Sequence, residues 1–121
     1  MQEQVKDIDR LLHIQEHAHL IIDQKNRINE KQFFADRFIQ LAFVKALENI
    51  GEAAYHLSKE TRNEFSEVPW TKMIKARHVY VHDYFEIDWK KIWITLETVD
   101  FELLLEQIKS IVEILKNRYV L

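Results

Sequence analysis

The chain has 121 residues, 47% of them apolar, with one glycine, one proline, no cysteine and a formal net charge of −3. This composition predicts one helical domain over residues 1–121, because so little Gly and Pro disfavours the tight turns of a β-sandwich or β-barrel. The lack of cysteine excludes disulfides, thiolate catalysis and cysteine-based zinc sites, and the negative charge requires any contact with nucleic acid to be local.

The N-terminal part of the chain predicts a long amphipathic helix over residues 5–25, followed by a turn at residues 26–29. The polar start of the chain and the lack of any apolar run near the roughly 20 residues that span a bilayer predict a cytoplasmic protein with no membrane partner. The helix is indicated by apolar residues at helical spacing, namely Ile8, Leu11, Leu12, Ile14, Ala18, Ile21 and Ile22.

A second long helix is predicted over residues 30–57. Phe34, Phe38 and Leu41 form a second apolar stripe on it, so we expect this helix to be central or shared with a second subunit. Gly51 costs about 1 kcal/mol relative to Ala in a helix interior and is expected to permit close contact with another helix. The main stripe is a heptad-like seam made of Ile39, Phe43, Ala46, Ile50, Ala53 and Leu57.

The rest of the chain predicts a linker and three more helices. Residues 58–68 are polar and are expected to be the linker, and Pro69 suits the first position of a helix. Asp88 is a candidate N-cap for a short helix, and a last amphipathic helix begins near Asp100. The sequence holds no strand pattern, so we expect an all-α, antiparallel bundle of about five helices.

Arg77 and His82 are the candidate catalytic residues. They stand in the run KARHVYVHDYFEIDW with four residues between them. A guanidinium supplies a fixed cation for a phosphate, and an imidazole titrates near neutral pH, so the pair is typical of a site that cleaves RNA without a metal. His78 lies on the same helical face as His82 and could orient it or donate to a phosphate. Lys72 and Lys75 are candidate RNA-binding residues.

This run resembles the signature of the HEPN ribonucleases and, more narrowly, of the HepT-like toxins. The shared pattern is Arg77, a polar residue, a short spacer, His82, and then Tyr84 as His-x-Tyr. The flanks follow the same order over roughly residues 30–115: a long helix ending in Ile-Gly-Glu-Ala, a Pro-Trp helix start, the motif and a final helix. The segment before residue 30 is similar only in being an amphipathic helix.

The resemblance implies a HEPN-like homodimer whose two copies bring their motifs into one cleft. It also implies a metal-independent endoribonuclease toxin, in which His82 accepts the proton of a ribose 2′-OH and Arg77 stabilises charge on the phosphoryl oxygens. The implied partners are RNA and a minimal nucleotidyltransferase antitoxin, which silences the toxin by AMPylation of Tyr84. No cofactor and no metal are expected.

Helix geometry leaves two ways to bring Arg77 and His82 together. In an unbroken helix the two residues are about 140° apart around the axis and roughly 7.5 Å apart along it. They therefore share no face. Either the helix ends near His82, or the pair is completed across a symmetric dimer.

Two other functions would be compatible with the same helices. One is a helical adaptor with a degenerate site that binds the nucleotidyltransferase, and the other is a nucleotide-binding helper of that transferase, because Arg77 and Tyr84 suit either polyanion. Taken without its flanks, Arg77 would be interpreted as part of a surface ion pair, for instance with Asp83. The complete set of Arg77, His78, His82 and Tyr84 favours the enzyme.

Two patterns could also indicate a metal site. His13 and His17 lie in HIQEH, which matches the motif of inverted zinc metalloproteases, but relative to the apolar face of their helix they are expected to point toward solvent. His78 and His82 have the i, i+4 spacing of two ligands on one helical face. Neither pattern is accompanied by cysteine.

Overall fold

The computed structural model describes residues 2–82 and 86–120, and for Gln2 and residues 78–82 it describes the backbone alone. Within this part of the chain there are seven helices and no strand, so the all-α prediction is confirmed. The helices are α1 (Gln2–Lys25), α2 (Glu30–Ala35), α3 (Arg37–Tyr55), α4 (Lys59–Glu64), α5 (Trp70–His82), α6 (Trp89–Thr98) and α7 (Phe101–Tyr119).

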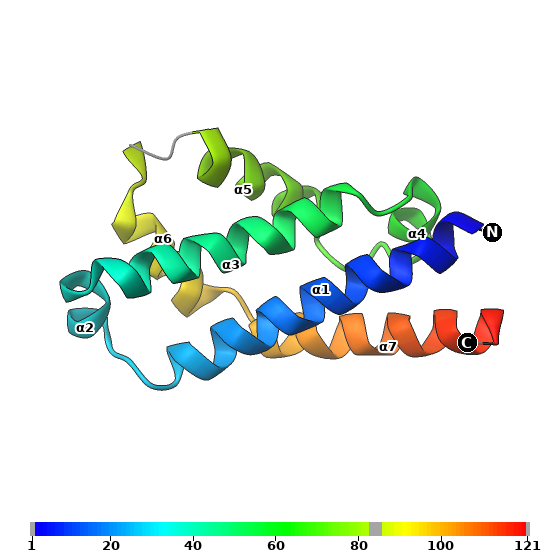
Figure 1. Ribbon diagram of the computed structural model, residues 1–121, viewed down its shortest axis with the longest axis horizontal. Coiled ribbons are helices and arrows are strands. Elements are labelled where there is room, and N and C mark those ends of the chain that lie inside the picture. Colours follow the sequence, from blue (N-terminus) through cyan, green and yellow to red (C-terminus); the bar gives the residue numbers. More distant parts are fainter. Residues whose placement is uncertain (1, 83–85, 121) are drawn as a thin grey trace.

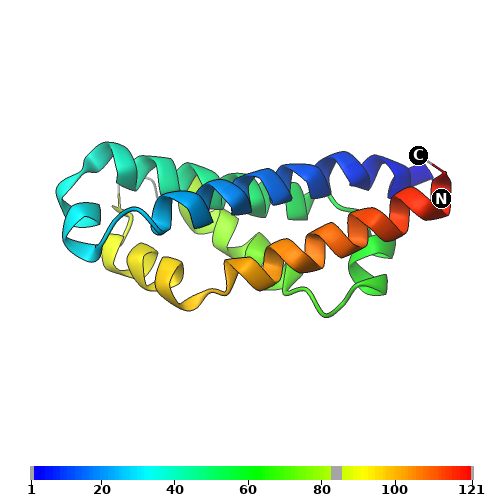
Figure 2. The same cartoon turned by 90° about the horizontal axis from the view of Figure 1, so that it is seen from below.

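Three long helices form the body of the molecule. α1 packs against both α3 and α7, and α5 packs along α3 (Figure 1). The two short helices α2 and α6 lie at one end, while α4 lies at the other end beside both termini (Figures 1 and 2). Neighbouring long helices run antiparallel, as predicted. None of the described helices is long and apolar enough to cross a membrane.

The predicted second helix is wrong in one respect, because it is broken at Asp36. This residue has an extended backbone, with φ −128° and ψ 102°, and its side chain accepts a hydrogen bond of 3.2 Å from the amide of Ile39. An aspartate that caps α3 in this way stops the preceding helix, since the cap residue must leave helical geometry. The break turns α2 so that Phe33 packs against Trp93, with ring centroids 5.1 Å apart.

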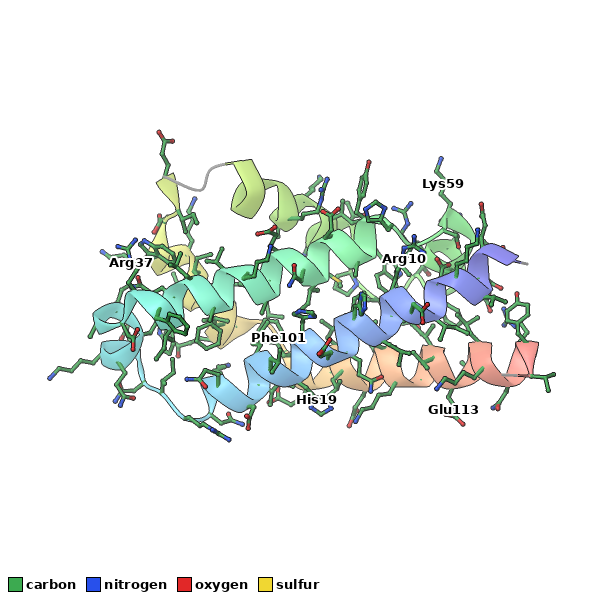
Figure 3. All side chains as sticks on the ribbon, viewed as in Figure 1. Arg10, His19, Arg37, Lys59, Phe101 and Glu113 are labelled. Atoms are coloured by element: carbon green, nitrogen blue, oxygen red, sulfur yellow. The ribbon has the colours of Figure 1, made fainter. Side chains whose placement is uncertain are left out.

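The second apolar stripe of this helix is largely uncovered at the break. Phe38 is 82% exposed and Phe34 is 41% exposed, while Phe43 and Ile50 on the main seam are buried. Beside Phe38, Arg37 places its guanidinium 5.2 Å from the Trp89 ring of α6 (Figure 3). The core is therefore built from one face of α3, and the start of that helix leaves apolar surface open.

The predicted linker at residues 58–68 is also wrong in part, because it contains α4. Ser58 caps this helix, and the buried carboxylate of Asp7 on α1 accepts bonds of 3.1 Å and 2.6 Å from the Ser58 amide and hydroxyl. The Thr61 hydroxyl also donates to Asp7, over 2.6 Å. A helix of six residues is too short to be stable alone, so this contact with α1 holds it.

The helix starts near Pro69, Asp88 and Asp100 were mostly predicted correctly. Asp88 and Asp100 cap α6 and α7, accepting hydrogen bonds from the first turns of those helices. Pro69 differs by one position, since α5 begins at Trp70 and the Pro69 carbonyl already accepts from the amide of Met73. The Trp70 indole donates to the backbone of the preceding turn, which fixes how the chain enters α5.

A polar cluster joins α1, α4 and α7 at the end that carries both termini. Arg118 donates to Glu64 over 2.9 Å, and Gln4 both donates to Glu64 over 2.8 Å and accepts from the Tyr119 hydroxyl over 2.6 Å. The bonds from Arg118 and then from Gln4 lower the pKa of Glu64 from 4.5 to about 2. This carboxylate is therefore ionised at neutral pH and bridges the two terminal helices.

Candidate active site

α3 and α5 come into close contact at Gly51. A Cβ at this position would lie 2.6 Å from the Arg77 Cβ and 2.7 Å from the Met73 carbonyl oxygen, closer than real Cβ atoms approach. A hydrogen is the only substituent that fits there. The predicted role of Gly51 is confirmed, and the contact presses the stem of Arg77 against α3.

The Arg77 guanidinium is held in place by two side chains of α3. Its Nη1 donates to Glu52 Oε2 over 2.7 Å, and its central carbon lies 4.3 Å from the centroid of the Tyr55 ring, a cation–π contact. Its Nε is buried and has no hydrogen-bond partner among the described residues, but the side chain as a whole is 21% exposed. The cation is thus oriented, and part of it remains accessible to a ligand.

Glu52 joins Arg77 to a histidine. While Oε2 of its carboxylate accepts from Arg77, Oε1 is 3.0 Å from Nε2 of His56. The hydrogen bond from Arg77 lowers the pKa of Glu52 against the opposing effect of partial burial, and the bond from His56 lowers it further. An ionised carboxylate can only accept, so His56 Nε2 carries a hydrogen and Nδ1 is left for other contacts. The His56 ring also meets the Tyr55 ring edge-on, 5.1 Å between centroids.

A polar groove of about 740 Å³ opens beside this cluster, between α1 and α3. Glu52 and His56 lie on its wall, so the groove adjoins the cluster through these two side chains, although Arg77 itself does not line it. Arg10 and Lys6 bring cations from α1, and Arg10 lies between α1 and the C-terminal part of α3 (Figure 3). Pockets of about 300–1,000 Å³ commonly hold small ligands, so this groove has room for a nucleotide.

A guanidinium, a carboxylate-bonded imidazole and an adjoining polar groove form a site suited to a phosphodiester. The description "Ribonuclease HepT-like" belongs to the family whose model matches residues 1–111. The chain belongs to this HepT-like family. The match includes α1, which the sequence motifs had linked to the family only as an amphipathic helix.

Curated relatives of this HepT-like chain are named as ribonucleases. "Putative RNase MJ0127" of Methanocaldococcus jannaschii is 35% identical over 114 residues, which cover 93% of this chain and 90% of the relative. "Putative RNase TTE0752" of Caldanaerobacter subterraneus is 34% identical over 105 residues, covering 85% and 91%. "Probable ribonuclease HepT" of Thermococcus cleftensis is 33% identical over 89 residues, covering 74% and 81%. No solved structure gave a significant match.

Arg77 and His82 of the HepT-like motif lie on α5. This helix runs unbroken from Trp70 to His82, so the backbone positions of Arg77 and His82 differ by about 140° around the axis and roughly 7.5 Å along it. The side chains of His78 and His82, and Tyr84 as a whole, lie outside the described residues. Their catalytic and modification roles therefore remain predictions.

The described residues include the candidate RNA-binding lysines and Arg77, for which an ion pair was the alternative interpretation. Lys72 and Lys75 are exposed on α5, as an RNA contact requires. Arg77 does form an ion pair, and its described partner is Glu52 of α3, whereas the suggested partner Asp83 lies outside the described residues.

His17 is not directed toward solvent, in contrast to our prediction. It is half-buried, its Nδ1–H donates to the carbonyl of His13 over 2.8 Å, and its Nε2 accepts from Asn49 over 3.0 Å. Both ring nitrogens are therefore occupied. Among the described side chains, no group of three His, Asp or Glu residues could hold a metal ion.

Sequence reasoning missed Glu52, Tyr55 and His56 as site residues. Glu52 entered the argument only as part of Ile-Gly-Glu-Ala, yet it follows directly after Gly51, where a close helix contact was expected. Glu52 and His56 also have the i, i+4 spacing of a bonded pair on one helix. These two signals together could have identified the cluster.

Proposed function

We propose that this HepT-like chain is a metal-independent endoribonuclease. The observation that carries the proposal is the Arg77 guanidinium, which Glu52 and Tyr55 hold in one orientation on the helix that also carries His82. A fixed cation of this kind binds a phosphodiester and stabilises the charge that develops on its oxygens. The ribonuclease names of the family and of the relatives support this choice of substrate.

The proposed reaction uses a nucleophile that belongs to the RNA. His82 accepts the proton of a ribose 2′-OH, and the oxygen attacks the adjacent phosphorus while Arg77 donates to the phosphoryl oxygens. The products are a 2′,3′-cyclic phosphate and a 5′-hydroxyl. Because no water has to be activated, the step has no need of a metal. Lys72 and Lys75, which precede Arg77 on α5, would bind the RNA backbone next to the site.

A homodimer is the proposed active form. The five-residue step along α5 separates Arg77 from His82, so a second copy would bring the two groups together in a shared cleft. Exposed apolar side chains of α1, α2 and the start of α3 offer surface for such a contact: Leu20, Phe34 and Phe38.

In the cell, we propose that the chain is the toxin of a toxin–antitoxin pair in the cytoplasm. Its partner would be a minimal nucleotidyltransferase that transfers AMP to Tyr84, placing negative charge and bulk beside His82. An inactive adaptor or a nucleotide-binding helper of that transferase is the alternative. The ordered Arg77 and its adjoining groove favour the enzyme, because an adaptor needs neither.

The test is cleavage of RNA by the purified protein, measured in EDTA. Wild type should release fragments that end in a 2′,3′-cyclic phosphate. Arg77→Ala and His82→Ala should each lower the rate by about 100-fold or more. Arg27→Ala is the matched control, because Arg27 is an exposed cation in an ion pair with Asp23 near the turn after α1. It should cleave like wild type.

Arg77→Ala and His82→Ala must keep the circular dichroism spectrum and the molecular mass of wild type, so that the loss of activity is not caused by misfolding. A wild type that cleaves no RNA would overturn the proposal and favour the adaptor. Activity that is lost in EDTA and restored by zinc would instead support a metal site at His78 and His82.

A further inference from the structure

His56 is the imidazole that the described residues place beside Arg77. One carboxylate connects them, with Glu52 Oε2 at 2.7 Å from Arg77 Nη1 and Oε1 at 3.0 Å from His56 Nε2. One aromatic ring also touches both, since Tyr55 lies 4.3 Å from the guanidinium carbon and 5.1 Å from the imidazole centroid. The contact through Glu52 and the contact through Tyr55 therefore both place the Arg77 guanidinium and the His56 imidazole next to each other.

The side chain of Arg77 points from α5 toward His56. Helical side chains point back toward the N-terminus of their own helix. α5 runs antiparallel to α3, so the N-terminal direction of α5 is the C-terminal direction of α3, where Tyr55 and His56 lie (Figure 1). His82 follows Arg77 by five residues in the opposite direction along α5.

The proposed reaction also needs a general acid, and no residue has yet been given that role. Cleavage breaks the bond from phosphorus to the 5′-oxygen, and an alkoxide leaves poorly unless it receives a proton. His82, acting as the base, gains a proton in the same step. A second group beside the bound phosphate must therefore supply one.

We propose that His56 is this general acid, and that Glu52 positions it. The proposal rests on the ribonuclease function proposed above. As the 2′-oxygen bonds to phosphorus and the bond from phosphorus to the 5′-oxygen breaks, the 2′-OH proton passes to His82. His56 enters the step as an imidazolium with a proton on each nitrogen, and it gives the proton on Nδ1 to the leaving 5′-oxygen. The two proton transfers balance. Glu52 accepts from Nε2–H throughout, which fixes the ring so that Nδ1 is the donating atom.

The surroundings of His56 suit a departing nucleotide. Its side chain is 50% exposed and lies on the wall of the groove between α1 and α3. The groove also carries Lys6 and Arg10, which can receive the next phosphate of the leaving strand. The titratable groups that line the groove around His56 are Lys6, Asp9, Arg10, His13, Glu16, His17 and Glu52.

The test uses an RNA whose scissile 5′-oxygen is replaced by sulfur. A thiolate leaves without a proton, because thiols are far more acidic than alcohols. His56→Gln keeps an N–H for Glu52 but supplies no acid. This variant should cleave ordinary RNA about 100-fold or more slowly than wild type, through kcat, yet cleave the sulfur substrate within a few-fold of wild type.

Three comparisons make the result specific. His82→Ala should be slow on both substrates, since the base is needed in either case. His19→Gln is the matched control, because His19 is exposed on α1 and points away from α3, and it should cleave both substrates like wild type (Figure 3). Rescue of His56→Gln by sulfur also shows that the variant is folded.

Two results would overturn the role of His56 alone. In one, wild type cleaves and His56→Gln cleaves ordinary RNA equally fast. In the other, His56→Gln is equally slow on both substrates, which indicates a structural effect. If wild type cleaves neither substrate, the ribonuclease function itself fails, and the role of His56 fails with it.

Discussion

Gly51 of α3 faces the Cβ of Arg77 on α5 with no room for a methyl group between them, since a Cβ at residue 51 would lie 2.6 Å from that atom. The next residue, Glu52, accepts a hydrogen bond from the same arginine. A glycine and an acid that are adjacent in sequence thus set both the distance between the helices and the orientation of the cation. The site is built into the packing of α3 against α5.

Gly51→Ala should therefore destabilise the protein and lower its activity. In an exposed helix this change stabilises by about 1 kcal/mol, but here the added methyl meets Arg77 and the Met73 backbone, and overpacking costs about 1–3 kcal/mol. We expect Tm to fall by several degrees and RNA cleavage to fall with it. Thermal denaturation followed by circular dichroism measures the first effect. Lys45→Ala, an exposed change on α3, is the control. A higher Tm in Gly51→Ala would contradict the close contact.

Stability should depend on the ionisation of Glu64 in acid. The folded state lowers the pKa of this carboxyl from 4.5 to about 2, so its bonds to Arg118 and Gln4 contribute fully above about pH 4.5 and are lost as pH falls toward 2. The Tm of wild type should therefore exceed that of Glu64→Gln at pH 6, and the difference should vanish near pH 2. The effect is small because the pair is exposed and screened by salt.

The oligomeric state can be tested through Phe38, whose side chain is 82% exposed. If the start of α3 contributes to the proposed dimer, light scattering at micromolar concentration should give twice the mass of one chain for wild type, and Phe38→Glu should shift it toward a monomer. Leu103→Glu changes an exposed apolar residue of α7 and should leave the mass unchanged. A stable wild-type monomer would remove the shared cleft from the proposal.

Control by AMPylation is tested with Tyr84→Phe, which removes only the acceptor oxygen. This variant should keep at least part of its ribonuclease activity but escape silencing by a minimal nucleotidyltransferase and ATP, because AMP excludes RNA by charge and bulk. Mass spectrometry should find additions in multiples of AMP on wild type and none on the variant. Modification of another residue, or ATP-dependent silencing of Tyr84→Phe, would contradict the assignment.

Local signals in the sequence were sufficient for much of the fold. The 3.6-residue periodicity predicted α1, α6 and α7, because it reports which face of a helix is buried. Asp88 and Asp100 marked helix starts, since a cap acts within one turn of its own position. The motif of Arg77, His82 and Tyr84 identified the family for the same reason, as it is contained in one short run of the chain.

Contacts between distant segments decided what the sequence left open. α4 forms because Asp7, more than fifty residues earlier in the chain, accepts hydrogen bonds from its N-cap residue. The predicted second helix is divided at Asp36, which caps α3, and Phe33 of the preceding helix packs into the core. The cluster around Arg77 depends in the same way on Glu52 of α3, which lies 25 residues earlier in the chain. Periodicity shows that a face is buried but does not show which helix covers it. Only the packing of α5 on α3 therefore brought Glu52 and His56 to the cation.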